Sequence, residues 1–69
     1  MDDRYPMVRQ LECRSCRAMT EHEAVDVDSS SHTRLLWGRY RCRGCRHEVG
    51  ETMTPSDHAT LRAALGKEA

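Results

Sequence analysis

Four cysteines are the residues of this 69-residue chain whose type and spacing most clearly indicate chemistry. They form two Cys-x2-Cys pairs separated by 25 residues, namely Cys13 with Cys16 and Cys42 with Cys45. Two intervening residues let both sulfurs of one tight turn reach the same ion, and two such turns complete a tetrahedron. The spacing therefore predicts a four-thiolate site for Zn²⁺. Four protein ligands leave no open coordination position, so we expect a structural metal and no enzyme activity.

Other uses of the cysteines are open at this stage. A redox Cys-x-x-Cys needs one pair beside a βαβ pattern, which this sequence lacks. Two disulfides would need an oxidising compartment. An iron centre uses the same four thiolates, and His47, two residues after Cys45, offers an alternative ligand.

Length and composition indicate that the chain needs a stabilising element besides its apolar core. The chain has no Phe, one Trp and two Tyr, and 32% of its residues are charged. A domain this short buries too little apolar surface to be stable without a disulfide, a metal or a partner chain. The first residues lack the apolar run of a secretory signal, and no apolar stretch approaches 18 residues. We expect a cytoplasmic protein with reduced thiols and no membrane contact.

The sequence divides into a flexible tail over residues 1–6, a metal-binding β region over residues 7–53 and a helix over residues 54–66. Apolar and alternating patterns predict strands over residues 7–13, 20–28, 33–41 and 47–53. Thr54 is the expected N-cap of the helix, Pro55 its first residue and Gly66 its stop. The stripe formed by Leu61, Ala64 and Leu65 is narrow, so the helix must pack on another element.

A turn centred on Ser31 would pair the two central strands with apolar residues opposite apolar residues and acids opposite bases. The expected pairs are Val25–Trp37, Val27–Leu35, Glu23–Arg39 and Glu21–Arg41, with His22 opposite Tyr40.

Residues 11–53 resemble the zinc ribbons of transcription and translation proteins. The likeness rests on the two Cys-x2-Cys pairs, the intervening hairpin and the run Trp37–Cys45, WGRYRCRGC, with an aromatic residue two positions before the third Cys. It implies a zinc-dependent fold, a three-stranded antiparallel sheet with the metal at one end, here followed by a short C-terminal helix. Many ribbons carry Gly after each second Cys, where this chain has Arg17 and Arg46. The ribbons of transcript-cleavage factors place an adjacent acidic pair at the hairpin tip, whereas Asp26 and Asp28 are separated, so we expect no cleavage activity.

Arginine is concentrated around the second cysteine pair. The formal net charge is zero, with 11 basic and 11 acidic residues, but no acid occurs between Ser29 and His47. Arginine with an aromatic residue on a sheet suits phosphates and unpaired bases. The candidate nucleic-acid contacts are Arg14, Arg17, Trp37, Arg39, Arg41, Arg43 and Arg46. The competing interpretation is that Glu21 and Glu23 neutralise some of these arginines and that the others offset the charge of the thiolates.

Two functions follow from these patterns. The first is nucleic-acid binding in transcription, translation or their regulation. The second is a protein-interaction adaptor that docks on RNA polymerase or another large enzyme. The expected partner is therefore nucleic acid or a complex that processes it, and we expect no small-molecule substrate because no catalytic constellation is visible.

Overall fold

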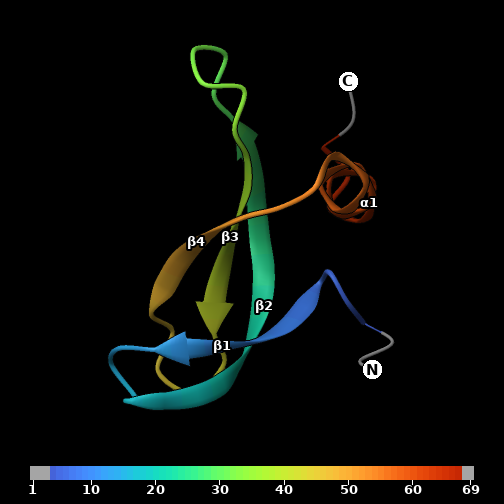
Figure 1. The fold of residues 1–69 in the computed structure, drawn as a ribbon. Coiled ribbons are helices and arrows are strands. Elements are labelled where there is room, and N and C mark those ends of the chain that lie inside the picture. The colour runs from blue at the N-terminus through green and yellow to red at the C-terminus, as the bar shows by residue number, and fades with distance from the viewer. Residues whose placement is uncertain (1–3, 68–69) are drawn as a thin grey trace.

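A computed structural model describes residues 4–67 as one four-stranded antiparallel sheet and one helix (Figure 1). The strands are β1 (Val8–Cys13), β2 (Ala18–Ser29), β3 (Leu36–Cys42) and β4 (Glu48–Thr52), and they lie side by side in chain order. The helix is α1 (Pro55–Ala64). No helix within residues 4–67 is long and apolar enough to span a membrane.

The sheet has four strands, so the expectation of three is wrong. The residue pattern itself predicts four strand segments, and the lower number came from the resemblance to zinc ribbons. The additional strand is β1, which pairs with the first half of β2 from Val8–Glu23 to Cys13–Ala18. β2 is 12 residues long, and its other edge pairs with β3 from His22 to Ser29.

The expected register between the central strands is also wrong. Next to the cysteines, His22 lies opposite Cys42 and Ala24 opposite Tyr40, a shift of two residues from the predicted pairs. A bulge between Ala24 and Asp26 then shifts the pairing by one more residue, so that Val27 lies opposite Gly38. The cause is the connecting loop, which is closed by a hydrogen bond from Ser30 N–H to the Leu35 carbonyl and is therefore wider than a turn centred on Ser31.

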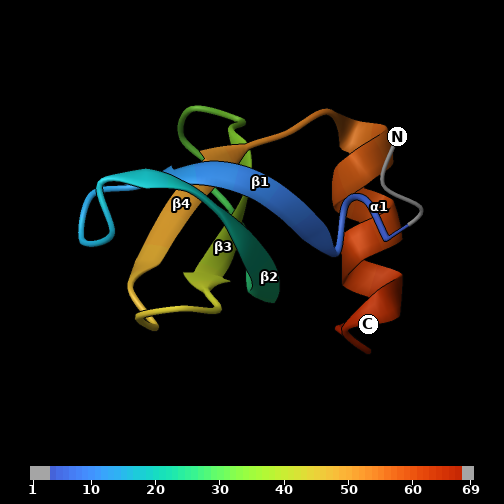
Figure 2. The same cartoon turned by 90° about the horizontal axis from the view of Figure 1, so that it is seen from below.

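The core lies between one face of the sheet and α1. Tyr40 and Leu61 are fully buried there together with Leu11 and Ala24. The helix approaches β3 closely at Gly38, where an added Cβ would lie 2.8 Å from Met53 Cε and 3.1 Å from Leu61 Cδ2. Figure 2 shows α1 against one side of the sheet, with the other side of the sheet uncovered by any helix.

The predicted helix start is confirmed. Thr54 is the N-cap, and its hydroxyl accepts a hydrogen bond of 3.2 Å from Asp57 N–H, while Pro55 begins the helix. At the other end, Leu65 is the C-cap and Gly66 has φ of 68°, the left-handed conformation that glycine adopts most readily.

Residues 1–3 of the expected flexible tail lie outside the described residues. Residues 4–6 are not loose, because they form a turn that contacts both the sheet and the helix. The Tyr5 hydroxyl donates to Asp57 Oδ2 at 2.7 Å, and the Tyr40 hydroxyl donates to the Pro6 carbonyl at 2.8 Å. The Arg9 guanidinium lies 5.6 Å from the Tyr5 ring centre and 5.4 Å from that of Tyr40. Residues 4–6 therefore connect α1 to the sheet through these contacts.

Candidate metal centre

The four cysteines meet at one end of the sheet, each pair in the turn of a hairpin. Cys13 ends β1 and Cys42 ends β3, while Cys16 and Cys45 follow in the two turns. All four sulfurs lie within 4.8 Å of one another, and none is in a disulfide. Cys13 and Cys42 are buried, and Cys16 and Cys45 are exposed. We call this group of sulfurs the cysteine cluster.

The two turns, which we call knuckles, have matching backbone geometry. Arg17 N–H donates to the Cys13 carbonyl at 2.7 Å, and Arg46 N–H donates to the Cys42 carbonyl at 2.9 Å. Arg17 has φ of 55° and Arg46 has φ of 66°. These are the left-handed values that a glycine adopts without strain, and they occur at the two positions where many zinc ribbons carry glycine. The knuckles therefore close with arginine in a strained conformation.

Hydrogen bonds to the sulfurs favour thiolates at the second knuckle. The Thr20 hydroxyl lies 3.1 Å from Cys42 Sγ, and this contact, together with the backbone N–H groups of Cys45 and Gly44, lowers the pKa of Cys42 to about 5. The backbone N–H of His47 is the largest cause that lowers the pKa of Cys45. Groups that stabilise a negative sulfur in this way are typical neighbours of metal ligands.

The pKa of Cys16 shifts in the opposite direction, because this thiol lies among the other three sulfurs. Its hydrogen bonds with Cys45, Cys13 and Cys42 raise its pKa to about 12. Four thiolates so close together repel one another unless a cation lies between them. A bound divalent ion supplies that charge and takes the place of the proton, since metal ions deprotonate the thiols that bind them. The cysteine cluster thus has the donors and the closeness to hold a metal ion.

The two histidines near the cysteine cluster do not belong to it. His22 is fully buried opposite Cys42, and its Nδ1 lies 2.9 Å from the Thr20 carbonyl. Its predicted position opposite Tyr40 is therefore wrong. The His47 side chain is exposed and is not part of the group of candidate ligands, so among residues 4–67 the four sulfurs form the cluster without it.

Three of the predicted nucleic-acid arginines are paired with carboxylates. Arg41 bonds to Glu48 at 2.9 Å, and Arg43 bonds to Glu21 at 2.6 Å. Arg39 lies 3.9 Å from the same Glu48. Such exposed pairs contribute only about 0–1 kcal/mol to stability, but they cancel positive charge along β3. The competing interpretation expected Glu23 to neutralise Arg39 and Glu21 to neutralise Arg41. The structure pairs both arginines with Glu48 instead, and Glu21 with Arg43.

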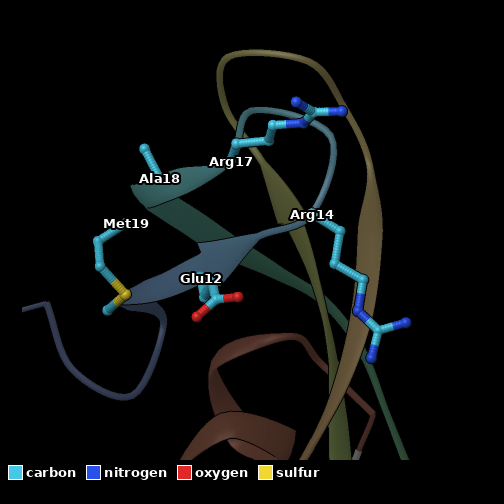
Figure 3. A pocket seen from close by; sticks show the side chains of 5 residues that line it. All are labelled: Glu12, Arg14, Arg17, Ala18 and Met19. Atoms are coloured by element: carbon cyan, nitrogen blue, oxygen red, sulfur yellow. The ribbon is translucent and has the colours of Figure 1, made fainter.

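The other three arginines lie on the two knuckles, next to the cysteines in the sequence. Within residues 4–67, no ion pair involves Arg14, Arg17 or Arg46. Arg14 and Arg17 line a hollow of about 510 Å³ with Glu12, Ala18 and Met19. Figure 3 shows both arginines extending away from Met19 in that view. Arg46 lines a second hollow of about 340 Å³ on the other knuckle, together with Arg41 and Arg43.

Trp37 is not brought to the knuckles. It is half-buried on β3, on the face opposite to the buried Gly38 and Tyr40. Cys42 is five positions further along the strand, which corresponds to about 16 Å. The residue that the sequence analysis missed is Thr20, since only the pairing of β2 with β1 and β3 reveals that its hydroxyl reaches a cysteine. No sequence signal identifies a threonine 22 positions away from its sulfur partner.

The chain matches no family model, and neither a curated protein nor a solved structure is significantly similar to it.

Proposed function

We propose that this chain is a zinc-stabilised protein that binds nucleic acid through the arginines of its two knuckles, in transcription, translation or their regulation. The observation that carries the proposal is that Arg17 and Arg46 hold left-handed backbone conformations beside the cysteine cluster and form no ion pair with any carboxylate of residues 4–67. Strained residues tend to be retained where their side chains have a use.

Zinc is the metal that best suits the cysteine cluster. Four thiolates in two Cys-x2-Cys turns are the usual ligands of structural Zn²⁺, which prefers tetrahedral sulfur coordination. The ion would fix the two knuckles to each other and thereby set the spacing of the arginines. It would have no open coordination position, so the function must reside in the protein surface around it.

Phosphate is the partner chemistry that suits the arginines. A guanidinium binds a phosphate with two parallel hydrogen bonds and stays charged at all physiological pH values. Arg14 and Arg17 lie on the first knuckle and Arg46 on the second. Their placement on both sides of one metal centre offers several contacts to one phosphate backbone, and such contacts dominate the affinity of nucleic-acid binding.

Glycine substitutions test this role without harming the fold. R17G and R46G remove the guanidinium and at the same time relieve the positive φ. We expect the free energy of unfolding to stay unchanged or to rise by up to about 1 kcal/mol, since relief of strain opposes the larger chain entropy of glycine. Binding of labelled single- and double-stranded oligonucleotides, measured by fluorescence anisotropy, should weaken with each substitution.

The matched control is R34G. Arg34 also has a positive φ, 56°, but lies in the loop between β2 and β3, away from the cysteine cluster. This variant should gain similar stability and keep the oligonucleotide affinity of the wild type.

The logarithm of the wild-type binding constant should fall with the logarithm of salt concentration at a slope of roughly −2 to −3, as three phosphate contacts require.

A measurement of zinc affinity distinguishes nucleic-acid binding from the other interpretation of these arginines, in which they offset the charge of the thiolates. If Arg17 and Arg46 only offset the charge of the thiolates, R17G and R46G will weaken zinc binding and leave oligonucleotide binding unaffected. The proposal would then be wrong.

The second candidate is the protein-interaction adaptor, and one observation favours it. Met19 is 62% exposed and lies with Ala18 at the 510 Å³ hollow, beside Arg14 and Arg17, which form no ion pair within the described part of the chain. Methionine and arginine are enriched in protein interfaces. M19S should weaken binding to a protein partner while leaving oligonucleotide affinity unchanged, so the variant separates the two functions.

A further inference from the structure

The outer edge of β4 borders a hollow of about 490 Å³, whose lining also includes Glu12 and Arg14 of the first hairpin. Cys42 N–H donates to the His47 carbonyl at 2.8 Å, and Met53 N–H donates to the Leu36 carbonyl at 3.0 Å. Because hydrogen-bonded pairs alternate along an antiparallel ladder, the backbone groups of Glu48, Gly50 and Thr52 point away from β3. In the part of the chain that the structure describes, no strand pairs with this edge, and Figure 1 shows β4 as the last strand of the sheet.

The fold itself does not require glycine at the centre of this edge. A Cβ at position 50 would meet only Trp37 Cε3, at an ordinary contact distance of 3.7 Å, and the backbone there has no positive φ. Glycine nevertheless destabilises a strand interior by roughly 0.5–1 kcal/mol relative to alanine. In strands it often marks a place where another backbone approaches closely. Gly50 thus points to a partner outside the chain.

We propose that two copies of this chain pair through the outer edges of β4, antiparallel and centred on Gly50. In this register Gly50 lies opposite the second copy's Gly50, Glu48 opposite its Thr52 and Val49 opposite its Glu51. The outward backbone groups of Glu48, Gly50 and Thr52 then face one another as hydrogen-bonded pairs. The contact uses the same surface on both copies, as a two-fold dimer requires.

Charge selects this register over its neighbours. A shift of two residues in one direction places Glu51 opposite the second copy's Glu51, and like charges directly opposite each other are unfavourable. A shift of two in the other direction pairs only Glu48 to Gly50 and leaves Thr52 without a partner. The register centred on Gly50 is the one that pairs all of β4 and opposes no like charges.

Trp37 supplies apolar contact at the centre of the dimer. The Cβ positions of directly opposed residues lie about 4.5–5.5 Å apart, and each indole lies 3.7 Å from the Cβ position of its own Gly50. With no side chain on either glycine, the two indoles meet over the paired strands. Trp37, half-buried in the single chain, becomes more buried in the dimer. The inference does not depend on the proposed nucleic-acid function.

Sedimentation velocity of the zinc-loaded full chain tests the dimer between about 1 µM and 1 mM. The mass should rise from one chain to two, and the emission of Trp37, the single tryptophan, should move to shorter wavelength over the same concentrations. T52E should weaken association roughly two- to thirty-fold, because two Glu–Glu pairs form by symmetry. T52K should strengthen it by placing lysine opposite Glu48 of the second copy.

The control is T60E, a like change on an exposed residue of α1, which should leave association unchanged. Zinc content and circular dichroism verify that each variant is folded. A monomeric mass throughout the range overturns the proposal. So does association that leaves the Trp37 emission unchanged, or that responds alike to T52E and T52K, since the contact would then lie elsewhere.

Discussion

At the scale of single residues, the metal centre depends on side chains that are not ligands. The Thr20 hydroxyl and the backbone N–H groups around the sulfurs lower the pKa of Cys42, while closeness to the other sulfurs raises that of Cys16. Cys42 is therefore poised to act as a thiolate that attracts a cation, whereas Cys16 must lose its proton to bind one.

We expect T20V to weaken zinc affinity about 10- to 100-fold, as is typical when a hydrogen bond to a ligand is removed. The valine keeps the shape of the side chain but offers no hydrogen bond to Cys42 Sγ. Competition with a chromophoric chelator measures the affinity. T60V is the control, since its hydroxyl bonds to the Ser56 carbonyl on the helix, away from the metal. Equal affinity in T20V and wild type would show that the Thr20 contact has no role in binding.

At the scale of elements, two hairpins each supply half of the metal centre, and α1 holds the opposite end of the sheet. The hairpin of β1 and β2 contributes Cys13 and Cys16, and that of β3 and β4 contributes Cys42 and Cys45. The helix packs on β3 where Gly38 leaves room for Leu61 and Met53. The two glycines within the strands therefore occur for different reasons. Packing within the chain requires glycine at position 38 but not at position 50.

This difference predicts opposite effects of alanine. G38A places a Cβ against Leu61 and Met53, so we expect the free energy of unfolding to fall by about 1–3 kcal/mol. G50A makes only an ordinary contact with Trp37, so at low protein concentration it should be neutral or stabilising by up to about 1 kcal/mol. Urea unfolding of the zinc-loaded variants measures both. Equal stability of G38A and wild type would mean that the helix does not pack closely on β3.

Most of the elements follow from local patterns in the sequence, whereas their pairing does not. The strand segments and the Thr54-Pro55 helix start are encoded by neighbouring residues. The register depends on the left-handed Arg34 in the wide loop and on the bulge after Ala24, and neither has a signal such as glycine in the sequence. Next to the cysteines, the error of two residues kept each side chain on its predicted face, because strand faces repeat every two residues.

The candidate site likewise contains some features that the sequence predicts and others that it does not. The four cysteines were predictable because Cys-x2-Cys spacing is a local geometric requirement. The carboxylate partners of the arginines were not, because they depend on the register. Arg41 pairs with Glu48 of β4 and Arg43 with Glu21 of β2, across strands whose alignment no local pattern determines.

At the scale of the whole molecule, the small core explains why a metal ion in the cysteine cluster would matter for stability. Within residues 4–67 the buried cluster contains Leu11, Ala24, Tyr40 and Leu61, and it lies at the helix end of the sheet. At the other end, the two hairpins are joined by the pairing of β2 with β3, and a metal ion held by the four sulfurs would link the two knuckles as well. In short domains of this kind, zinc binding supplies about 10–16 kcal/mol of apparent free energy, which is also folding free energy.

Removal of the metal should therefore unfold the chain. With excess chelator, we expect the far-ultraviolet circular dichroism of the sheet to disappear and the emission of Trp37 to move to longer wavelength. Both signals should return when zinc is added back. An unchanged spectrum, with metal loss verified by elemental analysis, would show that the small core suffices.

The placement of residues 4–6 and 65–67 gives this small molecule a direction. Residues 4–6 contact α1 through Tyr5 and Asp57, and residues 65–67 follow directly from the same helix. Figures 1 and 2 both show these segments beside α1 and the knuckles at the opposite end of the molecule. A fusion, a tether or a surface attached at either terminus would consequently leave the cysteine cluster and its arginines pointing outward, accessible to whatever they bind.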